Sequence, residues 1–144
     1  MKAMKPIHFL SLICLGLFSI SSCKAPAGGP IEGTPWKLVY MNGDIPEELE
    51  ITAVFQSGKV TGKGVCNRYF ADYEIESGIL KIGPVGATKM MCPENALLES
   101  QYFGVLSKAQ SFSVNGKTLN MECEGAKLRF VKGEETKPAS KPES

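Results

Sequence analysis

The sequence predicts an α+β domain: a mainly antiparallel curled sheet, or partly open β-barrel, of short strands with one amphipathic helix. Three observations support this fold class. Short segments that alternate apolar and polar residues recur along the chain, which is typical of half-buried strands. Pairs such as Ser-Gly and Asn-Gly separate these segments, as the turns of hairpins do. A single segment near residue 100 changes to a period of about 3.6 residues, which indicates a helix.

The first half of the folded region is expected to form five strands, at residues 36–41, 51–55, 59–63, 68–75 and 79–82. A turn at Asn42-Gly43-Asp44 ends the first of them. Ser57-Gly58 and Ser77-Gly78 are each expected to close a hairpin between two neighbouring strands, because glycine adopts the positive φ that tight turns need.

Three further strands are expected near the end of the chain, at residues 110–114, 118–123 and 126–131. Asn115-Gly116 suits a type I′ turn between the first two, and Glu124-Gly125 turns the chain again. Because side chains alternate between the two faces of a strand, one set of residues should face the core. These residues are Leu119, Met121, Cys123, Leu128 and Phe130.

Residues 93–108 break the period of two and predict the helix, with Pro93 and Glu94 in its first turn. The expected apolar face consists of Leu98, Tyr102, Val105 and Leu106, supported by Leu97 and Phe103. The expected polar face consists of Glu99, Ser100, Gln101 and Ser107. We interpret the apolar face as core packing and not as a ligand site.

Residues 1–22 are expected to be a lipoprotein signal peptide. Lys2 and Lys5 give a positively charged start, and residues 7–20 form an uncharged apolar run that is short for a membrane span. The run ends in Ile20-Ser21-Ser22-Cys23, which resembles the bacterial lipobox. The resemblance implies cleavage before Cys23 and lipidation of that residue, which would anchor the chain in a membrane. The alternative is an ordinary secretory signal with a chance cysteine.

Removal of the signal would limit the chemistry of the chain. Lys2, Lys5 and His8, the only histidine, would be lost, and the formal net charge would fall from +1 to −1. Without imidazole, the mature chain could hold neither a histidine-dependent nucleophile nor a histidine metal site. Arg68 and Arg129 are the only arginines, so nucleic-acid binding has little support. We therefore expect no enzyme, no catalytic residue, no metal and no cofactor.

The mature chain is expected to have three parts. Residues 23–33 carry the lipidated Cys23 and are rich in Pro, Gly and Ala, which predicts a flexible tether. Residues 34–131 form one domain, and residues 132–144 form a disordered polar tail. Lys24 follows the lipidated cysteine, which in enteric-type sorting favours the outer membrane, facing the periplasm.

Three cysteines remain besides Cys23, and outside the inner membrane the environment favours disulfides. A Cys66–Cys92 bridge would tie the middle of the sheet to the start of the helix and stabilise the fold by roughly 3–4 kcal/mol. Alternatives are a redox-sensing thiol at Cys92 and a Cu(I) site made by Met90, Met91, Cys92 and Cys123. Cys123 suits a buried free thiol, although a bridge to either partner stays open.

Several short motifs together resemble the META domain family, which includes HslJ-like heat-shock lipoproteins. They are Trp36-Lys37-Leu38, Gly62, Val65-Cys66-Asn67-Arg68-Tyr69-Phe70, Tyr73, Thr88-Lys89-Met90-Met91-Cys92 and Glu99. The resemblance implies a small β-rich domain with one helix and no known reaction. Val65, where the family commonly has glycine, and the additional Cys123 depart from its pattern. Structural roles are expected for three of these residues: Asn67 in a turn, Gly62 at a bulge and Thr88 at a strand end.

These observations favour a non-enzymatic envelope lipoprotein that binds another protein or supports stress or antibiotic tolerance at the outer membrane. Its expected partners are the membrane, through the lipid on Cys23, and an envelope protein of unknown identity. One alternative is a carrier that holds a small apolar ligand inside a partly open barrel. Another alternative is a thiol-based redox sensor.

Overall fold

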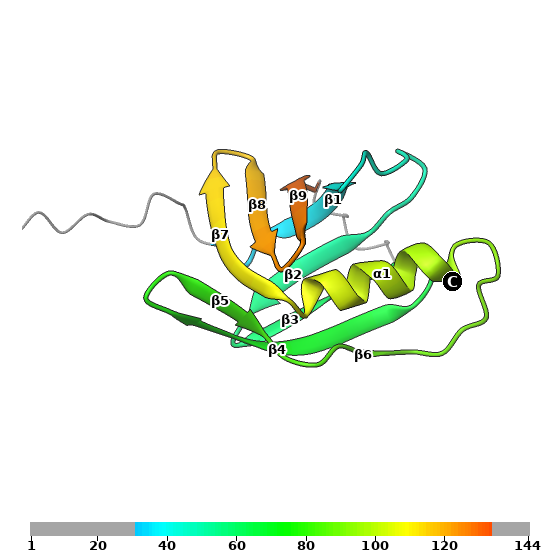
Figure 1. Cartoon of the computed structure of the whole chain (residues 1–144), viewed down its shortest axis with the longest axis horizontal. Helices are drawn as coiled ribbons and strands as arrows, with labels where there is room; N and C mark the ends of the chain where they lie inside the picture. The colour runs from blue at the N-terminus through cyan, green and yellow to red at the C-terminus, as the bar shows by residue number, and fades with distance from the viewer. Residues whose placement is uncertain (1–30, 134–144) are drawn as a thin grey trace, which may run out of the picture.

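The computed structural model describes residues 31–133. Nine strands and one helix follow one another in this part of the chain (Figure 1). They are β1 (Pro35–Met41), β2 (Thr52–Gln56), β3 (Lys59–Lys63), β4 (Arg68–Glu76), β5 (Ile79–Ile82), β6 (Gly86–Ala87), α1 (Ala96–Leu106), β7 (Ala109–Asn115), β8 (Thr118–Cys123) and β9 (Ala126–Lys132). The eight predicted strands and the single helix are present, and β6 is an additional short strand.

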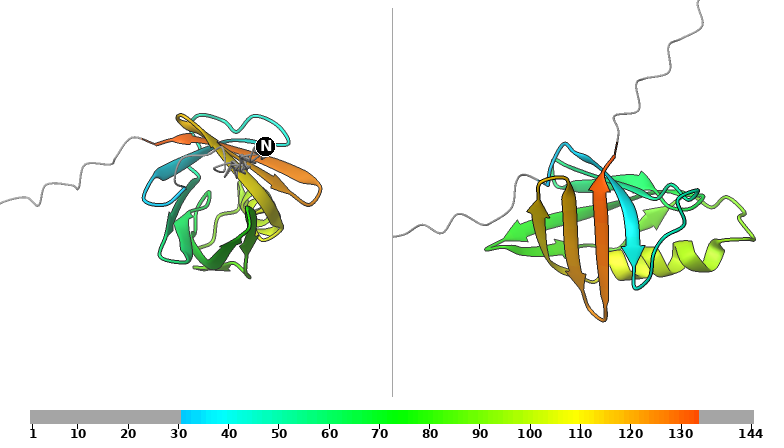
Figure 2. Two further views of the ribbon diagram at one scale, coloured as in Figure 1. Left: turned by 90° about the vertical axis from the view of Figure 1, so that its left-hand side faces the viewer. Right: turned by 90° about the horizontal axis from the view of Figure 1, so that it is seen from above.

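The strands form one antiparallel sheet that closes on itself. Their order is β3-β2-β1-β9-β8-β7-β5-β4. The last strand of this order, β4, also pairs with the first, β3, and this pairing completes the ring. Gly62 pairs with Tyr69 at this closure, in an unbroken register that runs from Lys59–Asp72 to Lys63–Arg68. The view along the long axis shows the strands surrounding a common interior (Figure 2). The predicted curled sheet is therefore a closed barrel.

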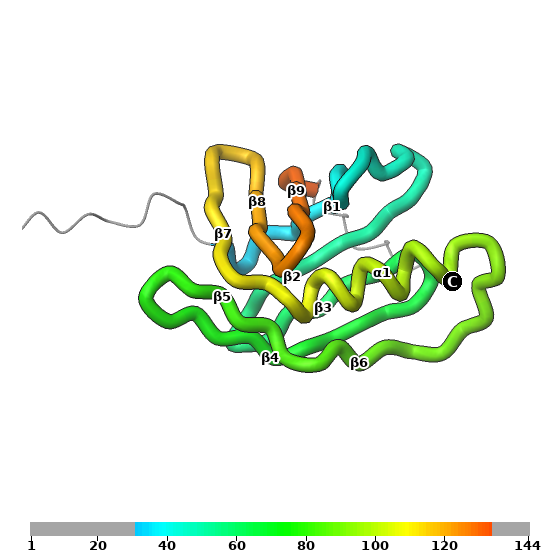
Figure 3. The backbone as a smooth tube through the Cα atoms, in the orientation of Figure 1, coloured from blue at the N-terminus to red at the C-terminus, as the bar shows by residue number. Residues whose placement is uncertain are grey.

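The ring is weakest between β5 and β7, which are joined by a single residue pair, Ile79 with Ser111. Because β5 has only four residues, it covers only the second half of β4. The first half of β4 pairs with β6 instead, through Tyr69 and Phe70. Helix α1 lies alongside this region (Figures 1 and 3). Tyr102 and Phe103 of the helix pack against Tyr69. The helix thus covers the part of the barrel that β5 leaves open.

The two Ser-Gly hairpins form as predicted. Ser57 and Gly58 both have positive φ, as do Ser77 and Gly78, which is the geometry of a type I′ turn. The predicted type I′ turn at Asn115-Gly116 is wrong. Asn115 pairs with Thr118, so the turn contains Gly116 and Lys117, and only Gly116 has positive φ. Glycine at the first central position gives a type II′ turn, shifted by one residue from the prediction.

The helix is shorter than predicted, and its core-facing side is mostly the predicted one, since Leu98, Phe103 and Val105 pack against the core beside the buried Tyr102 and Leu106. It begins at Ala96, after the cap residue Asn95, so Pro93 and Glu94 lie before the helix and not in its first turn. Cys92, the residue before Pro93, is held by a disulfide to Cys66. The disulfide restrains the path of the chain that leads into the helix. The buried residues of α1 are Glu99, Tyr102 and Leu106, whereas Leu97 is 73% exposed. Glu99 and Leu97 have therefore exchanged the sides predicted for them.

The barrel interior is filled by large side chains. Trp36, Phe55, Phe130, Leu119 and Met121 are almost completely buried, together with most of the other inward-facing residues. The five inward residues predicted for β8 and β9 are all buried. Such a core supplies most of the free energy that holds a small domain together.

Both ends of the described chain pack onto the barrel, which corrects the predicted extent of the tether and the tail. Ile31 is buried and accepts a hydrogen bond from the Trp36 indole at 3.0 Å, and Gly33 bonds to Phe55. Lys132 ends β9, and Gly133 donates to the carbonyl of Pro35 at 2.7 Å. No helix among residues 31–133 has the length and hydrophobicity needed to cross a membrane. The predicted signal peptide and the lipidated Cys23 lie outside the described residues.

Candidate functional site

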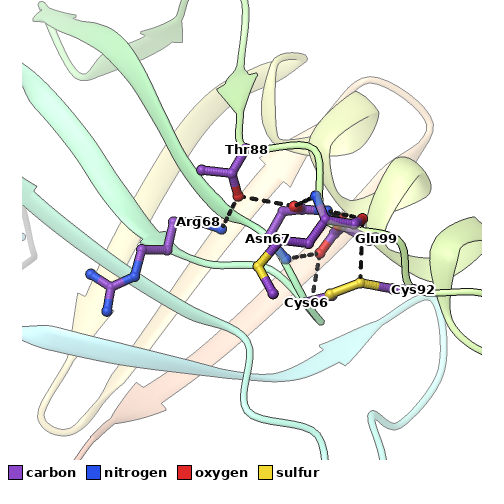
Figure 4. Close-up of a disulfide and its surroundings, with 7 residues drawn as sticks. Cys66, Asn67, Arg68, Thr88, Cys92 and Glu99 are labelled. Atoms are coloured by element: carbon purple, nitrogen blue, oxygen red, sulfur yellow. Dashed lines mark hydrogen bonds between the residues drawn. A yellow bond between two sulfur atoms is a disulfide. The ribbon is translucent and has the colours of Figure 1, made fainter.

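The residues singled out in the sequence meet where three segments converge. Residues 64–67 join β3 to β4, residues 88–95 lead from β6 to α1, and the first turns of α1 pack onto both (Figure 4). Cys66 and Cys92 form a disulfide with their Cα atoms 6.2 Å apart. Both cysteines are half-buried. The disulfide therefore ties the β3–β4 loop to the segment that leads into the helix.

Glu99 occupies the centre of this region. Its side chain is only 6% exposed, and one carboxylate oxygen, Oε2, accepts hydrogen bonds from the backbone N–H groups of Cys66 and Asn67, each at 2.7 Å. The other oxygen, Oε1, accepts a bond from the Asn67 side-chain amide at 2.6 Å. A buried carboxylate is costly unless it is satisfied in this way. The helix is thus fastened to the β3–β4 loop by a charged group.

Asn67 extends the network to the segment after β6. Its side-chain oxygen accepts hydrogen bonds from the Met90 backbone N–H at 2.6 Å and from the Thr88 hydroxyl at 2.9 Å. The Thr88 hydroxyl in turn accepts a bond from the Arg68 N–H at 3.2 Å (Figure 4). The Thr88 N–H donates to the Arg68 carbonyl. Asn67 and Thr88 therefore have the backbone-bonding and strand-end roles predicted for them.

The surroundings of Glu99 favour its charged form. Burial by itself raises the pKa of this carboxyl, but hydrogen bonds from Asn67, Cys66 and Val65 outweigh the effect of burial, and the pKa lies below its usual value. Glu99 is thus ionised at neutral pH and accepts hydrogen bonds. A group of this kind does not act as a general acid or base near pH 7.

Two glycines allow the close packing around this network. A Cβ on Gly64 would lie 2.7 Å from the Glu99 carboxylate and 2.9 Å from the ring of Phe103. A Cβ on Gly62 would lie 2.0 Å from the Thr52 carbonyl oxygen. Gly62 was predicted at a bulge, but the register between β3 and β4 is continuous there. It is required because β2 and Tyr69 approach it closely.

A pair of tyrosines connects the network to the core. The hydroxyls of Tyr69 and Tyr102 are 2.8 Å apart, and the Tyr69 hydroxyl also donates to the Thr52 carbonyl at 2.8 Å. Burial raises the pKa of both phenols well above the usual value. Among residues 31–133, no buried side-chain nitrogen or oxygen lacks a hydrogen-bond partner. The cluster is therefore a satisfied structural network.

Apolar side chains project from the outside of the same region. Met91 is 95% exposed, Met90 is 64% exposed and Leu97 is 73% exposed. Residues between Met91 and Leu97 in the sequence help to line a hollow of about 320 Å³, and its lining also includes Leu49, Val65 and the Cys66–Cys92 disulfide. We call these residues, with Met90, Met91 and Leu97, the apolar tip. It projects at one end of the long axis of the molecule, where the chain passes from β6 into α1 (Figures 1 and 2).

The cysteines are poorly placed for chemistry in this structure. Cys66 and Cys92 are bonded to each other, and Cys123 is the free thiol of the described residues. Cys123 is buried on β8, and burial, with a smaller effect of Glu122, raises the pKa of its thiol to about 11. A thiol with such a pKa is almost entirely protonated at neutral pH and is a weak nucleophile.

The alternative predictions for the cysteines have different outcomes. The Cu(I) site predicted as an alternative would need Cys92 and Cys123 as thiolates, which this arrangement does not provide. The predicted Cys66–Cys92 disulfide is present, and the bridge to Cys123 that the sequence left open is absent from the described residues.

Sequence reasoning identified most members of the network but assigned one of them to the wrong environment. Cys66, Asn67, Thr88, Met90 and Cys92 come together as their motifs suggested. Glu99 was expected on the exposed face of the helix. In the sequence, only the resemblance to the META domain family singled out Glu99, as one of the motif residues.

The chain thus forms a closed antiparallel barrel covered by one helix. A disulfide beside a buried carboxylate joins the helix region to the barrel. The model of the META domain family matches residues 29–135, and the chain belongs to this family. No curated protein matches the sequence.

Solved structures support the same fold. An NMR structure of a protein from Burkholderia xenovorans has a TM-score of 0.61 at 22% identity, covering 78% of this chain and 94% of that one. Another protein, also solved by NMR, has a TM-score of 0.59 at 18% identity, covering 74% of this chain and 95% of the other. A crystal structure of a DUF4847 family protein from Bacteroides vulgatus has a TM-score of 0.54 at 13% identity, covering 72% and 96%. At these identities the likeness concerns the fold alone.

Proposed function

We propose that this META domain protein is a non-enzymatic, lipid-tethered interaction module of the bacterial outer membrane, and that the apolar tip is its binding surface. The observation that carries the proposal is the combination of rigidity and exposure at the tip. The disulfide and the Glu99 network fix the backbone of residues 88–92, yet Met91 in this segment is almost fully exposed. The tether rests on the lipobox around Cys23, and the outer-membrane localisation rests on Lys24 after it.

A rigid, exposed apolar segment suits binding because little conformational entropy remains to be lost when a partner docks. Methionine is common at surfaces that accept varied apolar partners, because its side chain is flexible and polarisable. Exposed apolar residues that cluster, unlike single ones, mark interaction sites. Met90, Met91 and Leu97 lie within eight positions of one another, on both sides in the sequence of Cys92, Pro93, Glu94 and Asn95, which line the hollow.

The charges beside the hollow indicate the kind of partner. Glu94 lines the hollow, and Glu48 is exposed next to Leu49, which also lines it. The proposed occupant is an apolar segment of another envelope protein that carries Lys or Arg beside its apolar residues. Opposite charges at the rim of an interface mainly increase the rate of association and the specificity. Lys89, which precedes Met90 in the sequence and is exposed, would suit an acidic residue of the partner.

The carrier alternative finds less support. A carrier needs an enclosed space, and the interior of this barrel is filled by Trp36, Phe55 and Phe130. The redox-sensor alternative needs an accessible thiol of lowered pKa. Cys66 and Cys92 are joined, and Cys123 has a raised pKa.

Site-specific photocrosslinking of the full chain in its own envelope tests the proposal. A photoreactive residue at Met91 should give a discrete crosslink, whereas one at Ile79, an exposed apolar residue on β5, should not. Adding Leu97→Asp should abolish the Met91 crosslink, and adding Ile75→Asp on β4 should leave it unchanged. Mass spectrometry of the crosslinked peptide should find an apolar segment with basic neighbours. Equal products from positions 91 and 79, or survival of the crosslink in Leu97→Asp, would refute the proposal.

A further inference from the structure

A second surface feature lies away from the apolar tip, on the outside of the barrel. A hollow of about 570 Å³ extends over β1, β2 and the end of β9. Lys37, Lys63 and Lys132 line it, and Glu50 is the only acidic residue that does so. Formal charges on its lining therefore sum to about +2, although the mature chain as a whole carries −1. We call this feature the lysine hollow.

The floor of the lysine hollow is apolar. Lys37 pairs with Val131 on β9 and with Thr52 on β2, and these residues point outward beside it. Pro35 and Val54, which are also paired across β1 and β2, complete the floor. The aliphatic residues are half-buried, and lysines around such residues form the kind of surface that rests at the boundary between lipid headgroups and acyl chains.

The position of the hollow relative to the chain ends is informative. Pro35 lines the hollow, and the described chain begins four residues earlier, at Ile31. Gly133, at the other end, also lines it and donates a hydrogen bond to the Pro35 carbonyl. Cys23 precedes Ile31 by eight residues, a length that cannot span more than about 28 Å. A lipid on Cys23 would therefore hold this face of the barrel close to the membrane.

We propose that the lysine hollow contacts the anionic phospholipids of the membrane that carries the protein. This inference rests on the proposed lipid anchor, which brings the hollow to the surface. A lipid surface fits better than a free phosphate ion because the three lysines are spread over three strands around a hollow of about 570 Å³. No buried polar side chain among the described residues is left without a partner to enclose a single ion. This contact would orient the barrel and leave the apolar tip free.

Vesicle binding by the chain of residues 24–144, without the lipid, tests this inference directly. This chain contains the whole closed barrel and its core. It should bind vesicles containing phosphatidylglycerol more tightly than vesicles of phosphatidylcholine alone. Each lysine near an anionic surface contributes about a five-fold change in affinity. The variant Lys37→Gln/Lys63→Gln/Lys132→Gln should therefore bind about 100-fold more weakly.

A matched control separates a local site from general charge. The variant Lys81→Gln/Lys108→Gln/Lys127→Gln loses the same charge on other surfaces and should bind within about two-fold of the natural chain, apart from weak screening effects. Thermal unfolding should show that both triple variants are folded. Equal loss of binding in both variants, or no preference for the anionic vesicles, would overturn the inference. Inorganic phosphate at millimolar concentration should not compete, and effective competition would overturn the choice of a lipid surface.

The outcome is independent of the proposed role of the apolar tip. Met91→Ser/Leu97→Ser should leave vesicle binding unchanged, since these residues lie outside the hollow. If this variant abolishes vesicle binding, the tip is the lipid-binding surface, and the inference about the lysine hollow is wrong. If vesicle binding behaves as expected but the Met91 crosslink is absent, the proposed function fails and the lipid contact stands.

Discussion

At the scale of single residues, Glu99 has the largest consequence, because one side chain connects the helix to the β3–β4 loop. We expect Glu99→Gln to lower the free energy of unfolding by about 2–4 kcal/mol. The amide keeps the size of the side chain but loses the charge, and its NH₂ group would face N–H donors. Urea unfolding measures this change. Glu94→Gln removes an exposed carboxylate of the same kind and should change stability by less than about 0.5 kcal/mol.

The same carboxylate makes stability depend on acid. Because the pKa of Glu99 is lower in the folded chain than in the unfolded one, its contribution is complete above the unfolded value, about 4.3, and is lost as pH falls through the folded value. The stability difference between natural chain and Glu99→Gln should therefore be constant from about pH 6 to 8 and shrink below about pH 4. Urea titrations across this range test it. A difference that grows toward low pH would contradict the assignment of Glu99 as a buried anion.

Two glycines provide a matched test of the packing around Glu99. A Cβ at Gly64 meets the Glu99 carboxylate and the Phe103 ring, so Gly64→Ala should destabilise the chain by about 1–3 kcal/mol. Gly104 lies on the exposed side of α1 with open space around it, and Gly104→Ala should stabilise by about 0.5–1 kcal/mol through helix propensity. Thermal unfolding of the two variants should thus shift in opposite directions. A neutral Gly64→Ala would show that the network tolerates displacement.

The burial of Glu99 could not be predicted from helical periodicity. A carboxylate between Leu98 and Ser100 fits the polar face of an amphipathic helix, and nothing in the helix itself indicates a donor for it. The donors are the backbone N–H groups of a loop more than thirty positions earlier, at Cys66 and Asn67. Long-range partners of this kind are outside the reach of a local pattern.

At the scale of secondary-structure elements, the disulfide connects the β3–β4 loop to the segment that leads into α1 and stabilises their contact. It links positions 26 residues apart, which corresponds to about 3.5 kcal/mol on the chain-entropy model. We expect Cys66→Ala/Cys92→Ala to lose about 3–4 kcal/mol of unfolding free energy. Cys123→Ala, which only removes a buried sulfur atom, should lose about 1 kcal/mol. Chemical unfolding measures both, and equal losses would contradict the bracing role of the disulfide.

Local turn chemistry made most elements predictable. Ser-Gly pairs at 57–58 and 77–78 determine the loop length and the positive φ values, so the strands on both sides followed directly. Asn115-Gly116 shows the limit of this reasoning. A turn centred on Asn115-Gly116 and a turn that begins at Gly116 both place this glycine where a positive φ is needed. The register of β7 with β8 decides between them. In that register Val114 pairs with Leu119, which places both side chains in the core.

At the scale of the whole molecule, closure of the sheet buries tyrosines that must stay neutral. Burial, with the nearby Glu32, raises the pKa of Tyr73 to about 12, and burial raises the pKa of Tyr69 and Tyr102 further. Their contribution to stability is complete below the unfolded pKa of about 10 and is lost as pH rises above it. Alkaline titration followed by phenolate absorbance should show these tyrosines ionising together with unfolding. Ionisation of all tyrosines in a chain that is still folded at pH 10 would contradict this.

The closed barrel itself could be predicted only in outline. Alternating strands and hairpin turns determine which neighbours in the sequence pair, but they do not determine whether the two edges of the sheet meet. Closure needs the first strand, β1, to pair with the last, β9, from Trp36–Lys132 to Met41–Leu128, and no local turn specifies that contact. The short β5 then leaves an opening that α1 fills.

The measurement that tests this account most directly is the cysteine status of the protein taken from its own envelope. Thiols would be labelled under native, non-reducing conditions, and the peptides would then be mapped by mass spectrometry. The account predicts that the Cys66 and Cys92 peptides are joined and that Cys123 is labelled only after denaturation. Labelling of Cys66 or Cys92 in the native protein, or a bridge that includes Cys123, would contradict the claim that this pair braces the tip and performs no chemistry.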